Sequence, residues 1–340
     1  MTPPEPRWRR TVTLTLGIAI SAAMVWYAFK DQPFGSVWAE ITGMRVAPML
    51  GAIVLSTLCF PLRLPRWRAL LRRDDGTPVS TGAMWHAIAI GFAANNTLPF
   101  RAGEVLRVAV VSRLGRIPFA TALSSLAVER VLDALVVVAL LSLGLLNAGF
   151  GAGVTLPGST APIATTAVRV GVACAVALGI AAMAAAYSTT TLALFDRLLP
   201  AGRLGRALHN FAARMLGGLN ALRDPRLAAA VLGWTTVIWL VNAAAFWIGF
   251  HAFNIVVPFT AALILQGVLL IGIAIPQAPG YAGFFELVIV KVLSLYGVPE
   301  SVGLAFALTY HVTTFIPITA LGAWSATRPG ITLKQPAEPA

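Results

Sequence analysis

Charged residues are scarce in this sequence, and acidic residues are scarcer still. Asp, Glu, Lys and Arg make up 11% of its 340 residues, and only 13 residues are acidic. So little charge cannot cover the surface of a water-soluble protein of this length. The two cysteines, Cys59 and Cys174, both lie in apolar runs, and the four histidines are scattered. The chain therefore offers neither a disulfide framework nor a metal site, and we expect no metal and no cofactor.

Apolar residues are abundant instead, at 58% of the chain, and the mean hydropathy is +0.80. The net charge is +12, an excess that in a soluble protein would suggest a nucleic-acid partner. Here the basic residues fall in short clusters between apolar runs, as in membrane proteins that face anionic lipid headgroups. We therefore expect membrane lipids as partners and no nucleic acid.

Six apolar runs are each long enough to cross a hydrocarbon core of ~30 Å as a helix rising ~1.5 Å per residue. The first run follows Arg7, Arg9 and Arg10 and lacks a small-x-small cleavage site, which indicates a retained helix and not a signal peptide. We therefore predict six full transmembrane helices, over residues 12–29, 46–62, 119–148, 165–187, 227–251 and 301–326.

The charges of the connecting segments predict the orientation, because positive residues concentrate on the side from which the chain is not translocated. Segments 149–164 and 252–258 carry no charge and are expected outside. Segment 188–226 carries six arginines, and the arginines from Arg63 to Arg73 follow the second run. Both are expected in the cytoplasm, together with both termini. We interpret the Arg63–Arg73 cluster primarily as a signal that sets the orientation of the chain, and only secondarily as a binding site.

Within the cytoplasmic segment, residues 203–222 place their apolar side chains on one helical stripe, with the arginines elsewhere. This pattern predicts an amphipathic helix at the membrane interface. We interpret it as a linker that rests on anionic headgroups.

Two further apolar segments, 80–116 and 258–299, must return to the side from which they start if the loop charges are to alternate. Each is interrupted midway, at 99–103 and at 276–283, by Pro and Gly. Non-helical backbone at that depth is tolerated only where protein or a polar cavity satisfies it. We predict two re-entrant helical hairpins, the first inserted from the cytoplasm and the second from outside. The expected fold is an all-α polytopic membrane protein with six full spans and two such hairpins.

The two interruptions resemble each other. Both read Pro-x-x-Ala-Gly, and each is followed by an acidic residue, Glu104 or Glu286. Further along, the pair Glu129-Arg130 corresponds to Tyr310-His311. Short matches are common in a chain so rich in Ala, Gly and Pro, but together with opposite directions of insertion they favour an inverted repeat. In such repeats broken helices meet near the bilayer midplane and form a substrate site. The residues expected to form the breaks and line the cavity are Asn95, Asn96, Pro99, Gly103, Pro276, Pro279, Gly280 and Gly283.

The helices that start near Ala102 and Ala282 would point unpaired N–H groups and the positive end of the helix dipole into this cavity. A lipid phosphate would fit there, with Arg101 beside it. The alternative is structural: Glu104 and Glu286 cap their helices, and Arg101 pairs with Glu104. Asn95 and Asn96 would bind freed backbone carbonyls or a headgroup, and we favour the backbone.

Three charged residues, Glu129, Arg130 and Asp133, lie within the apolar run 119–148. Each costs about 2.5–3.5 kcal/mol at a membrane centre on insertion scales, so the three should face a partner or water and not lipid. One interpretation is a buried ion pair between Arg130 and Asp133. The one we favour is that Glu129 and Asp133 hold Arg130, together with Arg101, so that their guanidinium groups grip a phosphate.

Two segments carry a family resemblance: residues 96–107, Asn-Thr-Leu-Pro-Phe-Arg-Ala-Gly-Glu-Val-Leu-Arg, and residues 122–133, Ala-Leu-Ser-Ser-Leu-Ala-Val-Glu-Arg-Val-Leu-Asp. They closely resemble the lysylphosphatidylglycerol synthase transmembrane family, also called the flippase-like domain family. Residues 276–286, Pro-Gln-Ala-Pro-Gly-Tyr-Ala-Gly-Phe-Phe-Glu, match its C-terminal Pro-x-x-Pro-Gly-x-x-Gly-x-x-Glu segment. The resemblance extends over roughly residues 10–328. It departs at His311, where many relatives carry Arg, so that a permanent charge is missing or depends on pH.

The resemblance implies a multi-pass protein of the bacterial inner membrane that handles lipids such as anionic phospholipids or polyprenyl-phosphate lipids. The aminoacyl-transfer activity of the synthases belongs to a separate soluble domain. The chain ends soon after its last apolar run, so we do not expect it to synthesise lysylphosphatidylglycerol by itself.

Three functions remain open. The first is a lipid translocator, with no enzymatic activity. The second is a membrane enzyme acting on a lipid headgroup, although no metal cluster, nucleophile–base pair or nucleotide loop supports it. The third is a non-transporting partner of a glycosyltransferase or lipid-modifying enzyme. In the first, which we favour, the headgroup-binding residues are expected to be Arg101, Glu104, Arg107, Glu129, Arg130, Asp133, Glu286 and His311.

Overall fold

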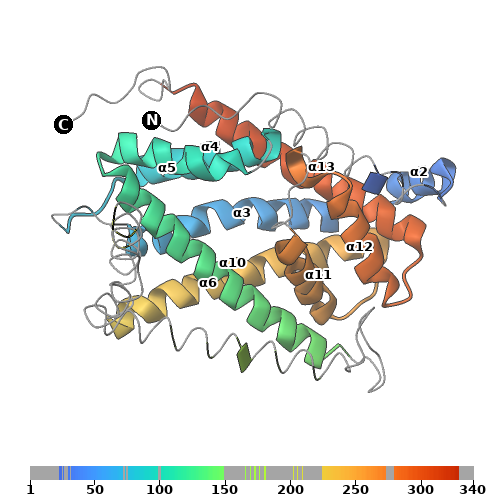
Figure 1. Ribbon diagram of the computed structural model, residues 1–340. Helices are drawn as coiled ribbons and strands as arrows, with labels where there is room; N and C mark the ends of the chain where they lie inside the picture. The colour runs from blue at the N-terminus through green and yellow to red at the C-terminus, as the bar shows by residue number, and fades with distance from the viewer. Residues whose placement is uncertain are drawn as a thin grey trace. The chain divides into compact units, whose positions relative to one another are not determined.

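The structure is a computed structural model, and its described elements are helical (Figure 1). Residues 32–71, 73, 76–98, 101–148, 224–272 and 279–328 are described, with single positions within 23–30, 165–180 and 202–209. Within these ranges lie nine α-helices, from α2 (Phe34–Thr42) to α13 (Glu300–Ala326), and two short 3-10 turns. The predicted all-α membrane fold is confirmed in its helical character.

The chain divides into two compact units that alternate along the sequence. The first unit combines Met1–Leu58, Ala89–Leu106 and Val241–Ser325, and the second combines Cys59–Ile88, Arg107–Leu240 and Ala326–Ala340.

Two long helices, α3 (Val46–Leu70) and α10 (Pro225–Phe250), pack together in each unit. In the first unit the Cα of Gly51 faces Ile248 so closely that an added Cβ would lie 3.3 Å from its Cγ2. In the second unit the Cys59 thiol donates to the Ile238 carbonyl oxygen at 3.8 Å. Small residues on α3 therefore let the backbones of α3 and α10 approach each other, as at helix contacts in membranes.

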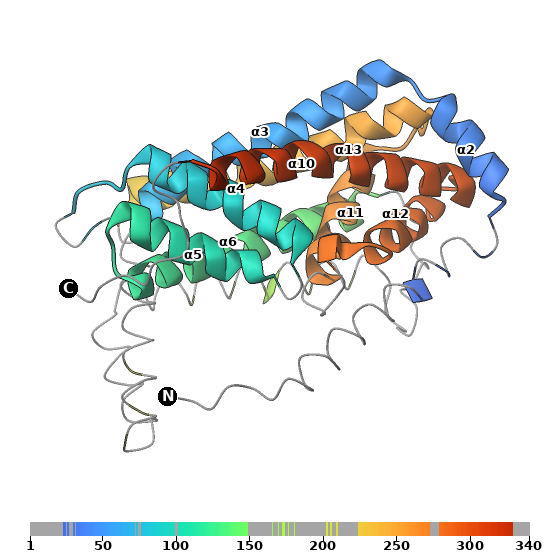
Figure 2. The same cartoon turned by 90° about the horizontal axis from the view of Figure 1, so that it is seen from above.

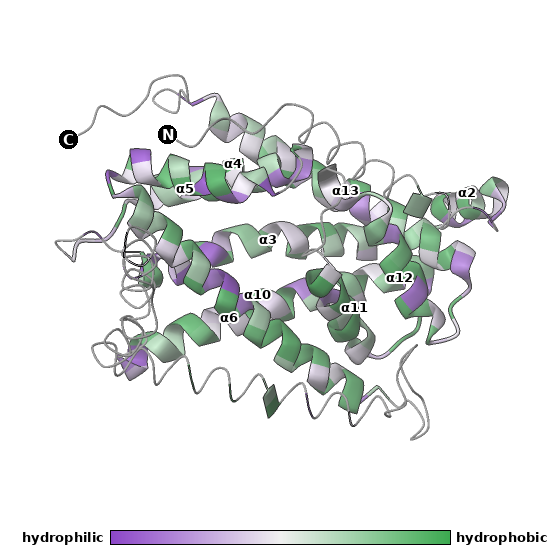
Figure 3. Ribbon diagram, in the orientation of Figure 1, coloured by the Kyte–Doolittle hydropathy of each residue, from purple (hydrophilic) through white to green (hydrophobic). Residues whose placement is uncertain are grey.

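Three described helices are long and apolar enough to span a membrane: Val46–Leu70, Pro225–Phe253 and Glu300–Ala326. They coincide with three of the six predicted spans. A fourth predicted run, 119–148, is a single 28-residue helix, α6 (Phe119–Leu146), which differs from the three by its charges near the middle. Its C-terminal half is almost uniformly apolar (Figure 3). The predicted spans 12–29 and 165–187 lie outside the described residues, as does the interfacial helix 203–222, so the number six stays a prediction.

The end predicted for the second span, residue 62, is wrong. α3 continues to Leu70, passing through Pro61 and Pro65 and including Arg63, Arg66 and Arg68. Proline removes a backbone hydrogen bond but does not always end a helix. Charged residues do not end this helix either, because Arg66 is fully buried against acidic partners described below.

The first interrupted segment consists of α4 (Thr81–Thr97) and α5 (Ala102–Gly115), separated by a break at 98–101. α5 begins at Ala102, as predicted. Arg101 precedes it with φ 54°, a left-handed conformation that is rare for a residue with a Cβ. Of the predicted break residues, Pro99 lies outside the described residues.

The second interrupted segment consists of α11 (Phe259–Gly272) and α12 (Phe284–Ser294), which pack against each other (Figures 1 and 2). A 3-10 turn, Pro279–Tyr281, precedes α12, whereas Pro276 lies outside the described residues. The second helix, predicted to start near Ala282, starts two residues later. Gly283 has φ 86°, so the helix cannot begin before it, and α12 starts at Phe284.

The two breaks share a backbone feature and lie near each other within the first unit. Tyr281 has φ 62°, close to the value for Arg101, and both residues precede an Ala-Gly pair. A Cβ added to Gly280 would lie 3.3 Å from the carbonyl oxygen of Asn96, at the end of α4. The repeat seen in the sequence therefore has a counterpart in the conformation of the backbone. Insertion from opposite membrane sides stays a prediction.

Gly103 is where the first hairpin closes. An added Cβ would lie 1.9 Å from the carbonyl oxygen of Gly91 and 2.5 Å from the Oδ1 of Asn95, so α5 starts directly against α4. No side chain fits between the two helices at this point.

We expect Gly103→Ala to lower the stability of the protein. The overlap is with backbone and cannot be relieved by a side-chain rotation, so a loss of about 1–3 kcal/mol or more is expected. Gly82→Ala, also in this hairpin but with nothing within 4 Å of the added Cβ, is the matched control. The measurement is the temperature at which helical circular dichroism is lost in detergent. Equal melting temperatures for the two variants would contradict this packing.

Candidate functional site

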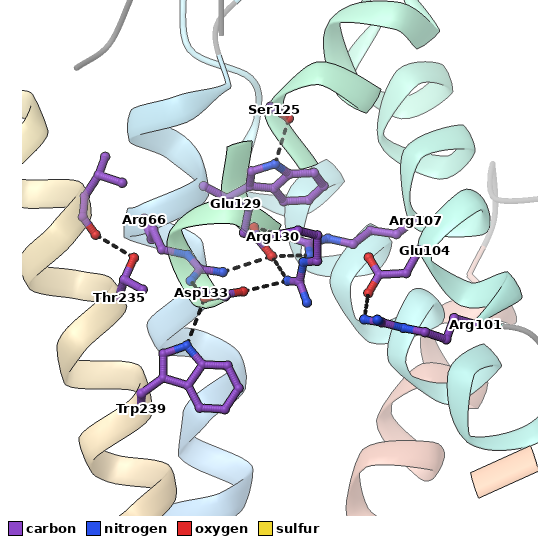
Figure 4. Close-up of polar contacts among 12 residues, drawn as sticks. Arg66, Arg101, Glu104, Arg107, Ser125, Glu129, Arg130, Asp133, Thr235 and Trp239 are labelled. Carbon is purple, nitrogen blue, oxygen red and sulfur yellow. Dashed lines mark hydrogen bonds and ion pairs between the residues drawn. The ribbon is translucent and has the colours of Figure 1, made fainter. Parts of the chain in front are cut away.

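A cluster of arginines and carboxylates joins three helices within the second unit (Figure 4). Arg66 of α3 lies between two carboxylates of α6. Its Nη2 is 2.9 Å from Glu129 Oε1, and its Nη1 is 2.5 Å from Asp133 Oδ1. The side chains of Arg66 and Glu129 are both 0% exposed. We call the full set the arginine cluster, and it consists of Arg63, Arg66, Arg107, Glu129, Arg130 and Asp133.

Glu129 also binds Arg107 of α5 through two parallel bonds. Arg107 Nη1 lies 2.8 Å from Oε1 and Nη2 lies 3.0 Å from Oε2. The Arg107 guanidinium stacks on the Trp67 ring at 3.9 Å from its centroid, and the Trp67 indole donates to the Ser125 hydroxyl at 3.1 Å. Two-point ion pairing and stacking on an aromatic face both fix the orientation of arginine. α3, α5 and α6 are therefore locked together at this point.

Asp133 connects the cluster to α10 and holds Arg130 in place. Its Oδ1 accepts a hydrogen bond from the Trp239 indole of α10 at 3.0 Å, in addition to the one from Arg66. Its Oδ2 lies 2.9 Å from Arg130 Nη2, which also contacts Glu129. Arg130 is thus anchored by both carboxylates, as predicted, and the Arg130–Asp133 pair considered as the structural alternative is part of the same network.

Arg130 differs from its neighbours in exposure. Its side chain is 29% exposed, whereas those of Arg66, Arg107, Glu129 and Asp133 are at most 2% exposed. Among these five, Arg130 is therefore the cation that a molecule outside the cluster can reach.

The arginine cluster carries more positive than negative charge. Its four arginines face two carboxylates, which leaves a formal charge of +2 among its six members. Arg63 is also buried, and Glu129 and Asp133 both act on its charge.

A second polar pair joins α12 and α13 within the first unit. Glu286 Oε2 accepts the backbone N–H of Gly283 at 2.7 Å, which caps α12 as the structural alternative predicted. Glu286 Oε1 lies 2.6 Å from His311 Nδ1. The imidazole packs on the Phe285 ring, with centroids 4.5 Å apart. The structure thus gives His311 an acidic partner that its place in the repeat did not indicate.

Arg101 pairs with Glu104, its neighbour on the same helix turn, at 2.9 Å. This is the local alternative that we considered for Arg101. Asn96 donates to the Thr319 hydroxyl at 3.0 Å, a side-chain partner that the sequence did not indicate, and Asn95 lies against Gly103.

The sequence did not indicate Arg66, Trp67 or Trp239 as site residues. Arg66 lies in the cluster that we interpreted as an orientation signal, and it is instead buried between Glu129 and Asp133. The two tryptophans carry no distinguishing pattern in an apolar chain. Among the residues that the structure describes, no three His, Cys, Asp or Glu side chains gather as a metal site.

Comparison with known proteins gives one family and one relative. The family model described as "Lysylphosphatidylglycerol synthase TM region" matches residues 14–322. The chain is also similar to a protein of Haloferax volcanii named "Glycosyltransferase AglD", with 26% identity over 90% of this chain and 53% of the relative. The chain therefore spans about half the length of this curated relative.

We expect a double-mutant cycle to show coupling between Arg107 and Glu129. Arg107→Gln and Glu129→Gln should each cost about 3–5 kcal/mol of stability, because each leaves a buried charge uncompensated. The double variant should lose less than the sum of the two. The measurement is unfolding of each variant by titration with a denaturing detergent.

The matched control is the same cycle at Arg101 and Glu104, whose side chains are 34% and 20% exposed. An exposed pair of this kind contributes at most about 1 kcal/mol. Strictly additive losses at Arg107 and Glu129 would contradict the described pairing.

Proposed function

The chain belongs to the lysylphosphatidylglycerol synthase transmembrane family, and from that premise we propose that it carries anionic lipid headgroups between the two leaflets of a membrane. The observation that carries this proposal is the positive excess of the arginine cluster, with one part-exposed guanidinium. A phosphate is the ligand that arginine recognises best, because its oxygens match the planar fork of N–H donors.

Arg130 is the residue that would touch the headgroup. Two carboxylates of its own helix orient it, so little of its conformational freedom would be lost on binding. The buried arginines would act through it: Arg66 contacts both Glu129 and Asp133, and Arg107 binds Glu129, so Arg130 shares its two carboxylates with other cations. A headgroup phosphate would be a further anionic partner for the exposed part of its guanidinium.

The energetic cost of the arginine cluster in lipid also favours a function. Each charge at the centre of a membrane helix costs about 2.5–3.5 kcal/mol on insertion scales, and α6 alone carries three. Apolar side chains of similar volume often give equal or greater stability than a buried ion pair. A requirement for binding an anion would explain why charges are retained here.

The interrupted hairpins support movement of the headgroup. Broken helices with their ends near the bilayer midplane are the usual site of transport in proteins built from inverted repeats. Our proposal includes the predicted topology: six spans, hairpins inserted from opposite sides, and both termini in the cytoplasm of a bacterial inner membrane. In it, the headgroup crosses beside the hairpins while the acyl or isoprenoid chains stay in the bilayer.

A second candidate function is favoured by the name of the relative. Because that protein is named a glycosyltransferase and is about twice as long, this chain could serve a sugar-transfer reaction as its membrane partner. A polyprenyl-phosphate lipid would suit both functions, since it also presents a phosphate. In this case Arg130 would retain the lipid for the enzyme without moving it across.

We expect the purified protein in liposomes to accelerate exchange of fluorescent phosphatidylglycerol or a polyprenyl phosphate between leaflets at least about tenfold over protein-free liposomes, and Arg130→Gln to abolish this gain. Arg130→Lys should keep part of it, because lysine retains the charge but not the fork. The readout is quenching of outer-leaflet label by dithionite.

Arg226→Gln is the control, because Arg226 is an exposed arginine at the start of α10. It should exchange lipid at the rate of the unaltered protein. Failure of the protein to accelerate any anionic lipid would refute translocation. Retention of bound lipid without exchange would favour the second candidate.

A further inference from the structure

The Glu286–His311 pair is the strongest feature that the proposed function leaves unused. It lies where α12 begins, beside the break of the second hairpin. Histidine is a side chain that proteins commonly use to bind and release a proton. The first half of the chain has Arg130 at the corresponding repeat position, where the charge is permanent.

The hydrogen bonds around Glu286 assign the protons of the pair. Both carboxylate oxygens accept: Oε2 from the Gly283 N–H at 2.7 Å, and Oε1 from His311 Nδ1 at 2.6 Å. When Glu286 accepts both bonds as a carboxylate, His311 Nδ1 carries the hydrogen between them, and Nε2 is the nitrogen left to gain or lose a proton.

Other groups around the pair also suit proton exchange. The His311 side chain is 18% exposed, which lets a proton reach the ring, whereas Glu286 is 8% exposed. Phe285 and Phe315 lie 4.5 and 5.9 Å from the imidazole centroid, and aromatic rings stabilise a neighbouring cation.

The ionisable groups on the neighbouring elements are few and engaged elsewhere. On α12, Lys291 binds Glu300 of α13 at 2.6 Å. Tyr310 of α13 stacks on Phe246 of α10. After α10, the ring of His251 bonds the Trp247 carbonyl oxygen at 2.8 Å. The part of the first hairpin that lies beside Gly280 is the C-terminal end of α4, at Asn96, which carries no charged side chain. Glu286 is thus the charged partner that the described contacts give to His311.

We propose that the Glu286–His311 pair binds the proton that accompanies an anionic headgroup past the second hairpin. A proton added to Nε2 changes the pair from a charge of −1 to 0. The uncharged pair then admits an anion to the break, whereas the negative pair repels it. By linkage the anion favours uptake of the proton to the same extent. The inference rests on the proposed function and specifies its energy coupling.

The test compares exchange of fluorescent phosphatidylglycerol in liposomes at pH 6 and pH 8. This lipid is chosen because its phosphate is a diester, which does not ionise in this range, unlike a monoester with a second ionisation at about pH 6. We expect exchange to be about tenfold faster at pH 6, because the proposed proton on the pair is more often bound at the lower pH.

Three substitutions in the pair set its charge, and they separate the proposed proton-binding role from a structural role. His311→Arg should give fast exchange at both pH values, and His311→Gln should give slow exchange at both. Glu286→Gln keeps an oxygen to cap α12 but removes the negative charge, so it should restore fast exchange at pH 8. His251→Gln, a histidine of the same unit outside the pair, should keep the pH dependence of the unaltered protein.

A second measurement does not depend on transport. Binding of phosphatidylglycerol to the protein in detergent should be tighter at pH 6 than at pH 8, and equal at the two pH values in His311→Gln. Lipid exchange with the same pH dependence in the protein and in His311→Gln would overturn the proton site while leaving translocation intact. Absence of exchange together with pH-independent binding would overturn both.

Discussion

The buried carboxylate of Glu129 is the interaction on which the second unit depends. It accepts contacts from Arg66, Arg107 and Arg130, which come from three helices (Figure 4). An isolated carboxylate would be costly at this depth, and so would each guanidinium without it. The positions of α3, α5 and α6 are therefore set by one electrostatic requirement, with Trp67 and Ser125 fixing the geometry around it.

The same requirement produces the feature that suggests a function. Four arginines of the arginine cluster share two carboxylates, and Arg130 is the one of them with a substantially exposed side chain. The break in the second half of the chain carries different charges. Glu286 caps α12 there, and His311 stands where the first half has the permanent cation Arg130. The two halves thus share a backbone motif but differ in which charges they carry.

Local signals in the sequence were sufficient for part of this account. Apolar length predicts the helices that became α10 and α13, and the Pro-x-x-Ala-Gly repeat predicts both breaks, because these depend on neighbours in the chain. Contacts between distant residues left no such signal. In the sequence, Arg66 is one of several arginines in a basic cluster, and only the fold places it beside Glu129. The sequence likewise does not indicate that Glu286 contacts His311. The end of α3 was misplaced for the same reason, since buried acidic partners allow arginines to continue a membrane helix.

The central claim is that the part-exposed guanidinium of Arg130 holds an anionic lipid. Native mass spectrometry of the protein and of Arg130→Gln, extracted from the same membranes, tests it most directly. The account predicts that an anionic lipid remains bound to the unaltered protein, that most of it is lost from the variant, and that its mass identifies the substrate. Identical lipid adducts on both proteins, or neutral lipids alone, would contradict the claim.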